Sequence, residues 1–355
     1  MIAKWMLSTA AALFALAGAT DVWALQPLSA AERATFFGSV EDPPAKELLG
    51  IKGYEGRHYL AGDEWNGHLW RPSLAGKGGG YIGVGADQAY LFIGWARPEL
   101  AWLIDYDILV VRLHGVHHIF FAAAADPKAF MHLWSDKAAG LAAIDAATET
   151  GTVPLDAAAK AELRKTYLHA RSHVSTRLRL LEKRLHKLKQ TAYLNNAEDY
   201  AHVRTLIQSG RVRRMSANLL ETKGLIGVGD AARRLGVPMR LVYLSNAEQY
   251  WPYTKAFRAN LRGLPMDAQS VIIRTLSTFS INKDYRYNVQ PGLTYQEFLA
   301  QDWMRHVHQM IPRRKLKDEK DIEFLVYERT PEELRGRRKP KAKAKSGGAG
   351  AQPKQ

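Results

Sequence analysis

The chain has 355 residues, of which 46% are hydrophobic and nine are Trp, so it is long enough for one large domain or two ordinary ones. It has no Cys, which excludes disulfides, zinc–thiolate sites, thiol catalysis and lipid attachment at an N-terminal Cys. The net charge of +15 comes from two segments: residues 160–190 hold ten Lys or Arg against two Glu, and residues 335–355 hold eight Lys or Arg and no acid.

The first 24 residues have the pattern of an export signal. Lys4 precedes an uncharged run over residues 5–20, and small residues stand at two cleavage points, after Ala24 or after Ala19. We therefore expect an exported protein, periplasmic or secreted. A retained N-terminal membrane anchor is the alternative, although the run is short for a spanning helix. No later apolar stretch is long enough to span a bilayer, so we expect no spanning segment after cleavage.

Residues 25–77 form an irregular segment that is rich in Pro, Gly and aromatic residues. A short helix is predicted over residues 29–37, because Ser29 followed by Glu32 makes a capping box. We expect the aromatic side chains of this segment, Tyr59 and Trp65 among them, to pack it onto the main domain. Stacking on a base or a sugar is the alternative use.

Residues 78–107 predict a nucleotide-binding βαβ unit: a strand at 81–85, a helix that begins after Ala86, and a second strand at 100–104. Glycines let the backbone approach a ligand, the helix N-terminus offers free amides, and a carboxylate at the second strand end can accept hydrogen bonds from ribose. A strand that merely ends in a tight turn is the alternative. The candidate cofactor-binding residues are Gly83, Gly85, Asp87, Gln88, Asp105 and Asp107.

Three histidines lie in the apolar segment that follows, residues 108–125. His114 and His118 are four residues apart, a spacing that can serve a metal on one face of a helix. No H-E-x-x-H frame surrounds them and no third ligand can be named. We therefore predict no metal site and expect His114, His117 and His118 to cover the edge of a core helix.

A helical insertion is predicted over residues 126–210, with a loop and a helix before a break at Val153-Pro154. The longest helix runs from Asp156 to about Thr191, with apolar residues in steps of three and four. The remaining faces, from Lys160 to Lys189, are basic and could lie on an anionic surface, whereas a solvated face is the alternative.

Strands and helices alternate through the rest of the chain. Helices are predicted at 197–208, 228–235, after 250 to about 262, and 294–308, and strands at 212–220, 239–244, 270–276 and 322–327, the last antiparallel at the sheet edge. This alternation predicts an α/β, Rossmann-like domain over residues 78–330, a mainly parallel sheet covered by helices.

In such sheets a ligand binds beyond the carboxyl ends of the strands. The residues after the strand at 239–244 therefore share a rim with the glycine turn, together with Asn218 and Glu221. The candidate substrate-binding residues are Ser245, Asn246, Glu248, Gln249 and Tyr250. No catalytic residue can be assigned from the sequence.

Residues 331–355 are dominated by Lys, Arg, Pro, Gly and Ala, a composition that cannot bury enough apolar surface to fold. We expect a disordered basic tail. From Arg335 to Lys354 it could bind anionic envelope polymers or nucleic acid.

Three stretches carry a resemblance to a known family: residues 81–88 (YIGVGADQ), residues 97–105 and residues 243–250 (YLSNAEQY). Over residues 78–276 the chain resembles a bacterial family that has a methyltransferase-like fold and no established function. The resemblance implies a sheet like that of S-adenosylmethionine-dependent methyltransferases. Gly83 and Gly85 would then lie at the first strand loop, and Asp105 at the ribose.

Two functions are weighed from the sequence. The first is an exported protein that binds an unknown small molecule at the strand-end rim, without established catalysis. The alternative is a methyltransferase with S-adenosylmethionine as cofactor, although export would separate the protein from the cytosol, where that cofactor is made. Binding of anionic polymers or nucleic acid through the basic helix and tail is a further alternative, but no recognised motif accompanies the charge.

Overall fold

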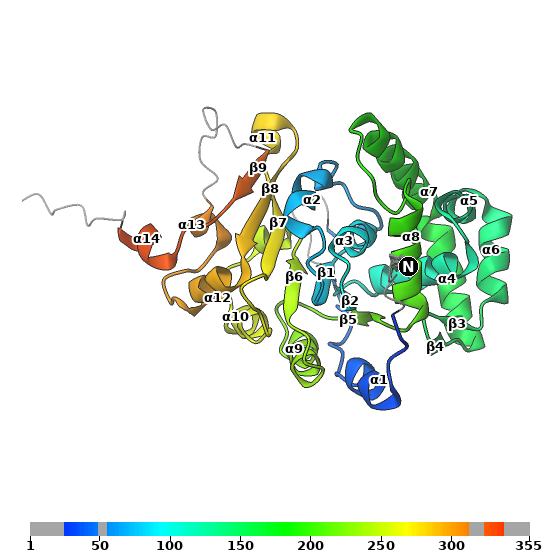
Figure 1. Ribbon diagram of the computed structural model, residues 1–355, viewed down its shortest axis with the longest axis horizontal. Coiled ribbons are helices and arrows are strands. Elements are labelled where there is room, and N and C mark those ends of the chain that lie inside the picture. Colours follow the sequence, from blue (N-terminus) through cyan, green and yellow to red (C-terminus); the bar gives the residue numbers. More distant parts are fainter. Residues whose placement is uncertain (1–24, 49–54, 312–322, 337–355) are drawn as a thin grey trace, which may run out of the picture.

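The computed structural model of the protein describes residues 25–48, 55–311 and 323–336 (Figure 1). Its centre is a seven-stranded sheet with the order β5-β2-β1-β6-β7-β8-β9. The strands are β1 (Gly80–Val84), β2 (Leu100–Asp105), β5 (Val212–Ser216), β6 (Met239–Tyr243), β7 (Val271–Ser277), β8 (Tyr285–Pro291) and β9 (Phe324–Val326). The first five in the sheet order pair in parallel, which confirms the predicted Rossmann-like α/β class.

Side chains that alternate along the central strands belong to two separate hydrophobic cores, one on each face of the sheet. On β1, Tyr81 belongs to one core and Ile82 to the other. On β2, Leu103 and Trp102 divide in the same way. Both faces of these strands are therefore buried, as expected for parallel strands covered by helices on each side.

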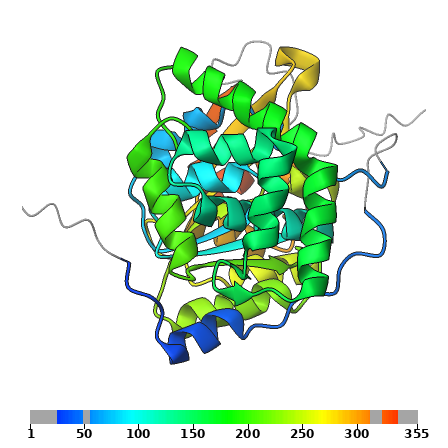
Figure 2. The same ribbon diagram turned by 90° about the vertical axis from the view of Figure 1, so that its right-hand side faces the viewer.

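Helices cover both faces of the sheet, and the longer ones are as follows. The first layer holds α3 (Gln88–Ala96), α4 (Ile108–Ala123), α5 (Pro127–Ser135), α6 (Lys137–Ala146), α7 (Ala157–Lys187) and α8 (Ala197–Gln208). The second holds α1 (Ala30–Phe37), α9 (Gly224–Arg234), α10 (Lys255–Arg262) and α12 (Gly292–Ala300). In Figure 2 the helices of the insertion stand in front of the sheet. Within the described ranges, no helix is long and apolar enough to cross a membrane.

Shorter elements complete the described chain. They are η1 (Gly67–Trp70), α2 (Arg71–Leu74), the hairpin of β3 (Glu149–Thr150) with β4 (Val153–Pro154), η2 (Ala247–Tyr250), α11 (Phe279–Asn282), α13 (Val307–Met310) and α14 (Pro331–Gly336). Ser29 and Glu32 form the predicted capping box at the start of α1.

The helical insertion follows the sequence pattern closely. The apolar stripe of α7, including Leu163, Val174 and Leu185, is buried against the other helices of the first layer, and the faces between are exposed or partly exposed. Whether the exposed cations of α7 contact an anionic surface stays a prediction. Residues 126–151 hold two helices, α5 and α6, where one was predicted. Asp126 and Asp136 each cap a helix with a side-chain oxygen, and the second cap separates the two.

Several expectations for the C-terminal part were wrong. Strand β8 was missed, because its sequence mixes Tyr and Val with Arg286, Asn288 and Gln290, all of which are buried. The single helix predicted at 294–308 is two helices, α12 and α13. In contrast, β9 lies at the sheet edge and runs antiparallel to the five parallel strands as predicted, because it pairs in parallel with β8, which is antiparallel to β7.

Two predictions concern the ends of the chain, the export signal and the basic tail, and most of their residues lie outside the described ranges. Pro331–Gly336 forms the short helix α14, so the first six residues of the predicted disordered tail are ordered. The rest of that tail, residues 337–355, and the signal segment, residues 1–24, lie outside the described residues.

Candidate functional site

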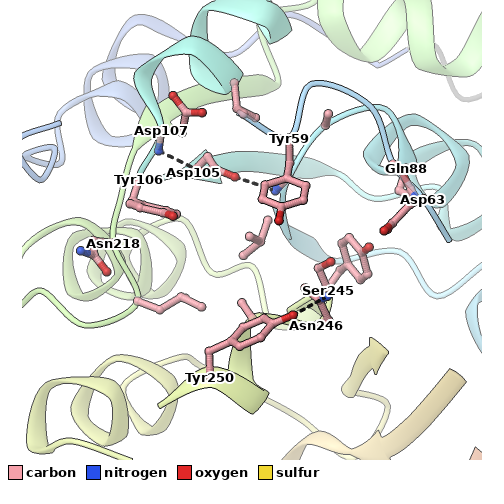
Figure 3. A pocket seen from close by; sticks show the side chains of 18 of the residues that line it. Tyr59, Asp63, Gln88, Asp105, Tyr106, Asp107, Asn218, Ser245, Asn246 and Tyr250 are labelled. Carbon is pink, nitrogen blue, oxygen red and sulfur yellow. Dashed lines mark hydrogen bonds between the residues drawn. The ribbon is translucent and has the colours of Figure 1, made fainter. Parts of the chain in front are cut away.

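The chain order of the strands reverses between β1 and β6. From β1 the chain adds β2 and then β5 on one side, and returns to add β6 and β7 on the other. Ligands of doubly wound sheets bind beyond the carboxyl ends of the strands at such a reversal. A cavity of about 410 Å³ opens at this place (Figure 3). It is lined by residues that follow β1, β2, β5 and β6 and by residues of the segment before β1.

Gly85 and Asp105 meet as the sequence predicted. Val84 pairs with Ile104 across β1 and β2. The Gly85 N–H donates to Asp105 Oδ2 over 3.2 Å, and the Asp107 N–H donates to Asp105 Oδ1 over 2.9 Å. Gly85 has φ +87°, and a Cβ at this position would meet nothing within 4 Å, so open space faces the turn.

The carboxyl group of Asp105 is strongly perturbed. Burial raises its pKa to about 7, and the neighbouring charge of Asp107 raises it too, while the backbone N–H groups of Asp107 and Gly85 lower it. Asp107 also lines the cavity; its Oδ1 accepts from the Leu109 N–H at the start of α4 and its Oδ2 lies 2.7 Å from His58 Nδ1. A perturbed acid in a cleft is a candidate for a functional group.

His114 supports the glycine turn from behind. Its Nε2 lies 2.8 Å from the Gly85 carbonyl oxygen, and its Nδ1 lies 2.9 Å from the Tyr90 hydroxyl. Burial lowers the pKa of His114 to about 3, so the ring is neutral and Nε2 is the nitrogen that donates. His117 and His118 are buried as well. The prediction that these histidines cover an edge was wrong, because α5, α7 and α8 enclose α4.

Two of the predicted cofactor-binding residues do not line the cavity. Gly83 lies inside the sheet, paired with Leu103 and Tyr243. Asp87 is fully buried, where its Oδ1 accepts from the Gly62 N–H over 2.6 Å and its Oδ2 accepts from Arg177 Nε over 3.1 Å. Asp87 therefore fastens the cavity wall to α7 and does not face a ligand.

Gln88, the third predicted residue of the turn, does line the cavity. Its Nε2 donates to the carboxylate of Glu64. No group of three or more His, Cys, Asp or Glu that could hold a metal ion exists among the described residues.

The predicted substrate-binding stretch divides into two halves. Ser245, Asn246 and Tyr250 line the cavity. Glu248 is fully buried on the other side, where its Oε1 accepts from the hydroxyls of Tyr295, over 2.8 Å, and Tyr253.

Gln249 also turns away from the cavity, and its Oε1 accepts from the Ser277 N–H over 3.1 Å. The short helix η2 causes this division, because consecutive residues of a 3₁₀ turn point in different directions. On the β5 side, Asn218 lines the cavity and Glu221 does not.

The most buried acid of the cavity, Glu64, was not predicted from the sequence. Glu64 is 4% exposed, and its Oε1 accepts from the Tyr243 hydroxyl over 2.7 Å and from Ser245 Oγ over 2.8 Å. Burial and the charge of Asp63 raise the pKa of Glu64.

Helix α7 holds the segment that carries this acid. Arg177 Nη2 donates to the Glu64 carbonyl oxygen over 2.8 Å, and Arg184 Nε donates to the Trp65 carbonyl oxygen over 2.8 Å. Residues 57–64 thus contribute to a wall of the cavity, whereas packing onto the main domain was the preferred prediction for this segment and stacking on a ligand the alternative.

The charge of the cavity is one-sided. Four carboxylates line it, those of Asp63, Glu64, Asp105 and Asp107, and the one cationic side chain among its lining residues is Arg57.

Residues 59–326 match a family described as Domain of unknown function (DUF7790), which covers more than half of the chain, and the chain belongs to this family. No curated protein matches the chain.

Proposed function

We propose that the cavity between β1 and β6 binds a nucleoside that carries a positive charge, a ligand of the S-adenosylmethionine class. The observation that carries the proposal is the contact of the Gly85 turn with the Asp105 carboxylate at the topological reversal of the sheet. An acid about 20 residues after a glycine turn is the group that binds ribose hydroxyls in nucleotide-binding βαβ units. Gly85 and Asp105 are separated by 20 residues.

The charge of the cavity narrows the ligand class. A dinucleotide or nucleoside triphosphate would bring its phosphates close to four acidic side chains, whereas Arg57 is the one cationic side chain in the lining. The N-cap residue of α3 is also an acid, the buried Asp87, so a carboxylate already stands at the helix end where a phosphate would bind. A sulfonium nucleoside has the ribose without the phosphates and adds a positive charge. The volume of about 410 Å³ falls in the range of roughly 300–1,000 Å³ that ligand pockets occupy.

Binding of the nucleoside is the function proposed here, and methyl transfer is the reaction for which a sulfonium nucleoside serves as donor. Transfer from a sulfonium needs the acceptor aligned behind the methyl group, so positioning by Ser245, Asn246 and Tyr250 would contribute much of the rate. Export of the protein remains a separate prediction.

Calorimetric titration of the full chain with S-adenosylmethionine, S-adenosylhomocysteine and ATP tests the proposal. We expect both sulfur nucleosides to bind and ATP not to bind. Asp105→Asn keeps the size of the side chain and should weaken binding about tenfold or more, because hydrogen bonds to a charged acceptor contribute about 1.5–3 kcal/mol.

Asp230→Asn is the matched control, since Asp230 lies half exposed on α9 in an ion pair with Arg233. Its affinity should equal that of the unaltered chain. No heat with either sulfur nucleoside, or equal binding of ATP, would contradict the proposal.

A further inference from the structure

Tyrosine rings are a feature of the cavity that ribose binding does not use. Tyr59 comes from the segment before β1, Tyr106 follows β2, and Tyr250 ends η2, and all three line the cavity. Figure 3 shows the rings of Tyr59 and Tyr250 entering the space from opposite walls. Tyr59 is 50% exposed and Tyr250 is 47% exposed, so a bound molecule can reach both side chains.

One of these rings already attracts a cation of the protein. The guanidinium carbon of Arg57 lies 5.3 Å from the centroid of the Tyr59 ring, and Arg57 itself lines the cavity. The face of an aromatic ring carries partial negative charge and binds cations within about 6 Å. The orientation of the Tyr59 ring therefore allows a cation–π contact, and Arg57 lies against one of its faces.

Two carboxylates add negative charge to the same space. Asp63 Oδ2 accepts from the Tyr285 hydroxyl over 2.8 Å, and the adjacent Glu64 is held by Tyr243 and Ser245. Figure 3 shows Asp63 and Ser245 on the same side of the space. Adjacent carboxylates repel each other, and a cation between them and the rings would relieve that repulsion.

We infer that the tyrosine-lined part of the cavity binds an organic ammonium group, with Tyr59 and Tyr250 supplying ring faces and Asp63 the opposite charge. The inference rests on the proposed function in one respect: the nucleoside occupies the side of Gly85 and Asp105. The ammonium group has two sources. It belongs to the amino-acid part of the nucleoside ligand, or to a separate amine that binds beside the nucleoside.

The first measurement compares two small probes that differ by one charge. The full chain is titrated with 5-aminopentanol and with 1,5-pentanediol, each with and without saturating S-adenosylhomocysteine. We expect the amine to bind about tenfold more tightly than the diol, because a cation over aromatic rings gains a factor of about three to thirty. If the amine is preferred only without the nucleoside, both compete for the same place, which identifies the ligand's own amino group.

Variants then assign the preference to the residues named. Asp63→Asn keeps an acceptor for the Tyr285 hydroxyl and removes the charge, and Tyr250→Leu removes the ring, so each should reduce the preference for the amine several-fold. Tyr250→Phe keeps the ring and should retain the preference. Asp230→Asn, remote on α9, is the charge control and should change nothing.

A second pair of ligands separates the two sources of the ammonium group. S-adenosylhomocysteine and 5′-deoxy-5′-methylthioadenosine share the nucleoside and the thioether, and only the first has an amino acid. If Asp63→Asn weakens the first and not the second, the subsite binds the amino group of the nucleoside ligand. If it weakens neither and lowers the amine preference in the presence of the nucleoside, the subsite binds a separate amine.

The outcomes of the two proposals are distinguishable. Equal affinities for amine and diol in the presence and absence of nucleoside, with Asp63→Asn leaving both nucleosides unaffected, would overturn the inference while the proposed function stands. Absence of nucleoside binding together with a preference for the amine, lost in Asp63→Asn and Tyr250→Leu, would reject the proposed function and support the ammonium subsite.

Discussion

Two groups of buried acids lie at the same end of the sheet and differ in how their charge is balanced. Glu248 lies fully buried beside Arg274, with 3.5 Å between Oε2 and Nε, and its Oε1 accepts from two tyrosine hydroxyls. Asp105 and Asp107 are also buried, and Asp107 lies beside His58, but the donors to Asp105 are backbone N–H groups.

The difference separates a structural acid from a candidate ligand-binding acid. A buried charge that is paired with an opposite charge of the protein does not need a ligand to compensate it. A buried acid beside open space, whose pKa is raised, is balanced only when something binds there or when it takes up a proton. Sequence position does not reveal this distinction, since Glu248 stands between two residues that line the cavity, Ala247 and Tyr250.

The largest expected effect is on stability and comes from removing Glu248 from its buried pair with Arg274. Glu248→Ala leaves Arg274 buried without its counter-charge and removes the acceptor of the Tyr253 and Tyr295 hydroxyls. We expect the free energy of unfolding in urea to fall by about 3–5 kcal/mol. Replacing both partners, as Glu248→Leu with Arg274→Met, should cost less. A loss below about 1 kcal/mol in the single variant would show that the pair does not anchor this end of the sheet.

The second effect concerns Asp105, whose contribution to the free energy of unfolding depends on pH. The pKa of Asp105 is raised to about 7, so the folded protein holds a proton more tightly than the unfolded chain. The stabilisation is complete below about pH 4 and is lost as the pH rises to about 7. It amounts to a few kcal/mol, since one pKa unit corresponds to about 1.4 kcal/mol.

Urea unfolding of the unaltered chain and of Asp105→Asn, at steps between pH 4 and pH 8, isolates this contribution, because the buried histidines titrate in both proteins. The difference between the two proteins should change across this window. A constant difference would contradict the raised pKa. Nucleoside affinity should follow the opposite course and rise through about pH 7, because ribose binding needs the ionised carboxylate.

The smallest effect tests the support behind the turn. His114→Leu removes the donor to the Gly85 carbonyl oxygen, and we expect nucleoside affinity to fall about tenfold, from one lost hydrogen bond and a less ordered turn. His114→Gln can still donate and should restore part of the affinity. The pH at which affinity rises should also move upward in His114→Leu, because a displaced Gly85 N–H no longer stabilises the Asp105 carboxylate. An unchanged pH profile would limit His114 to a packing role.

Features that depend on residues close together in the sequence could be predicted. The glycine turn, the strand at β2 and its terminal Asp105 could be predicted, because parallel neighbours in a βαβ unit must bring those ends together. The stripe of α7 could be predicted from its periodicity. In contrast, Glu64 meets Tyr243 across 179 residues, and no pattern in either segment indicates the other. Asp87 follows the glycine turn, where a cofactor-binding residue is expected, and only its contact with the distant Arg177 shows that it holds the fold together instead.

The attachment of residues 62–66 to helix α7 limits how this protein can be divided. Arg177 and Arg184 reach out of the insertion and hold the backbone of Glu64 and Trp65, which precede the first strand of the sheet. A shortened protein without the insertion would keep the seven strands of the sheet and lose the support of one wall of the cavity. The smallest unit that keeps the cavity intact therefore extends from Arg57 through the insertion to the strands that follow it, and the insertion is as much part of that unit as the sheet.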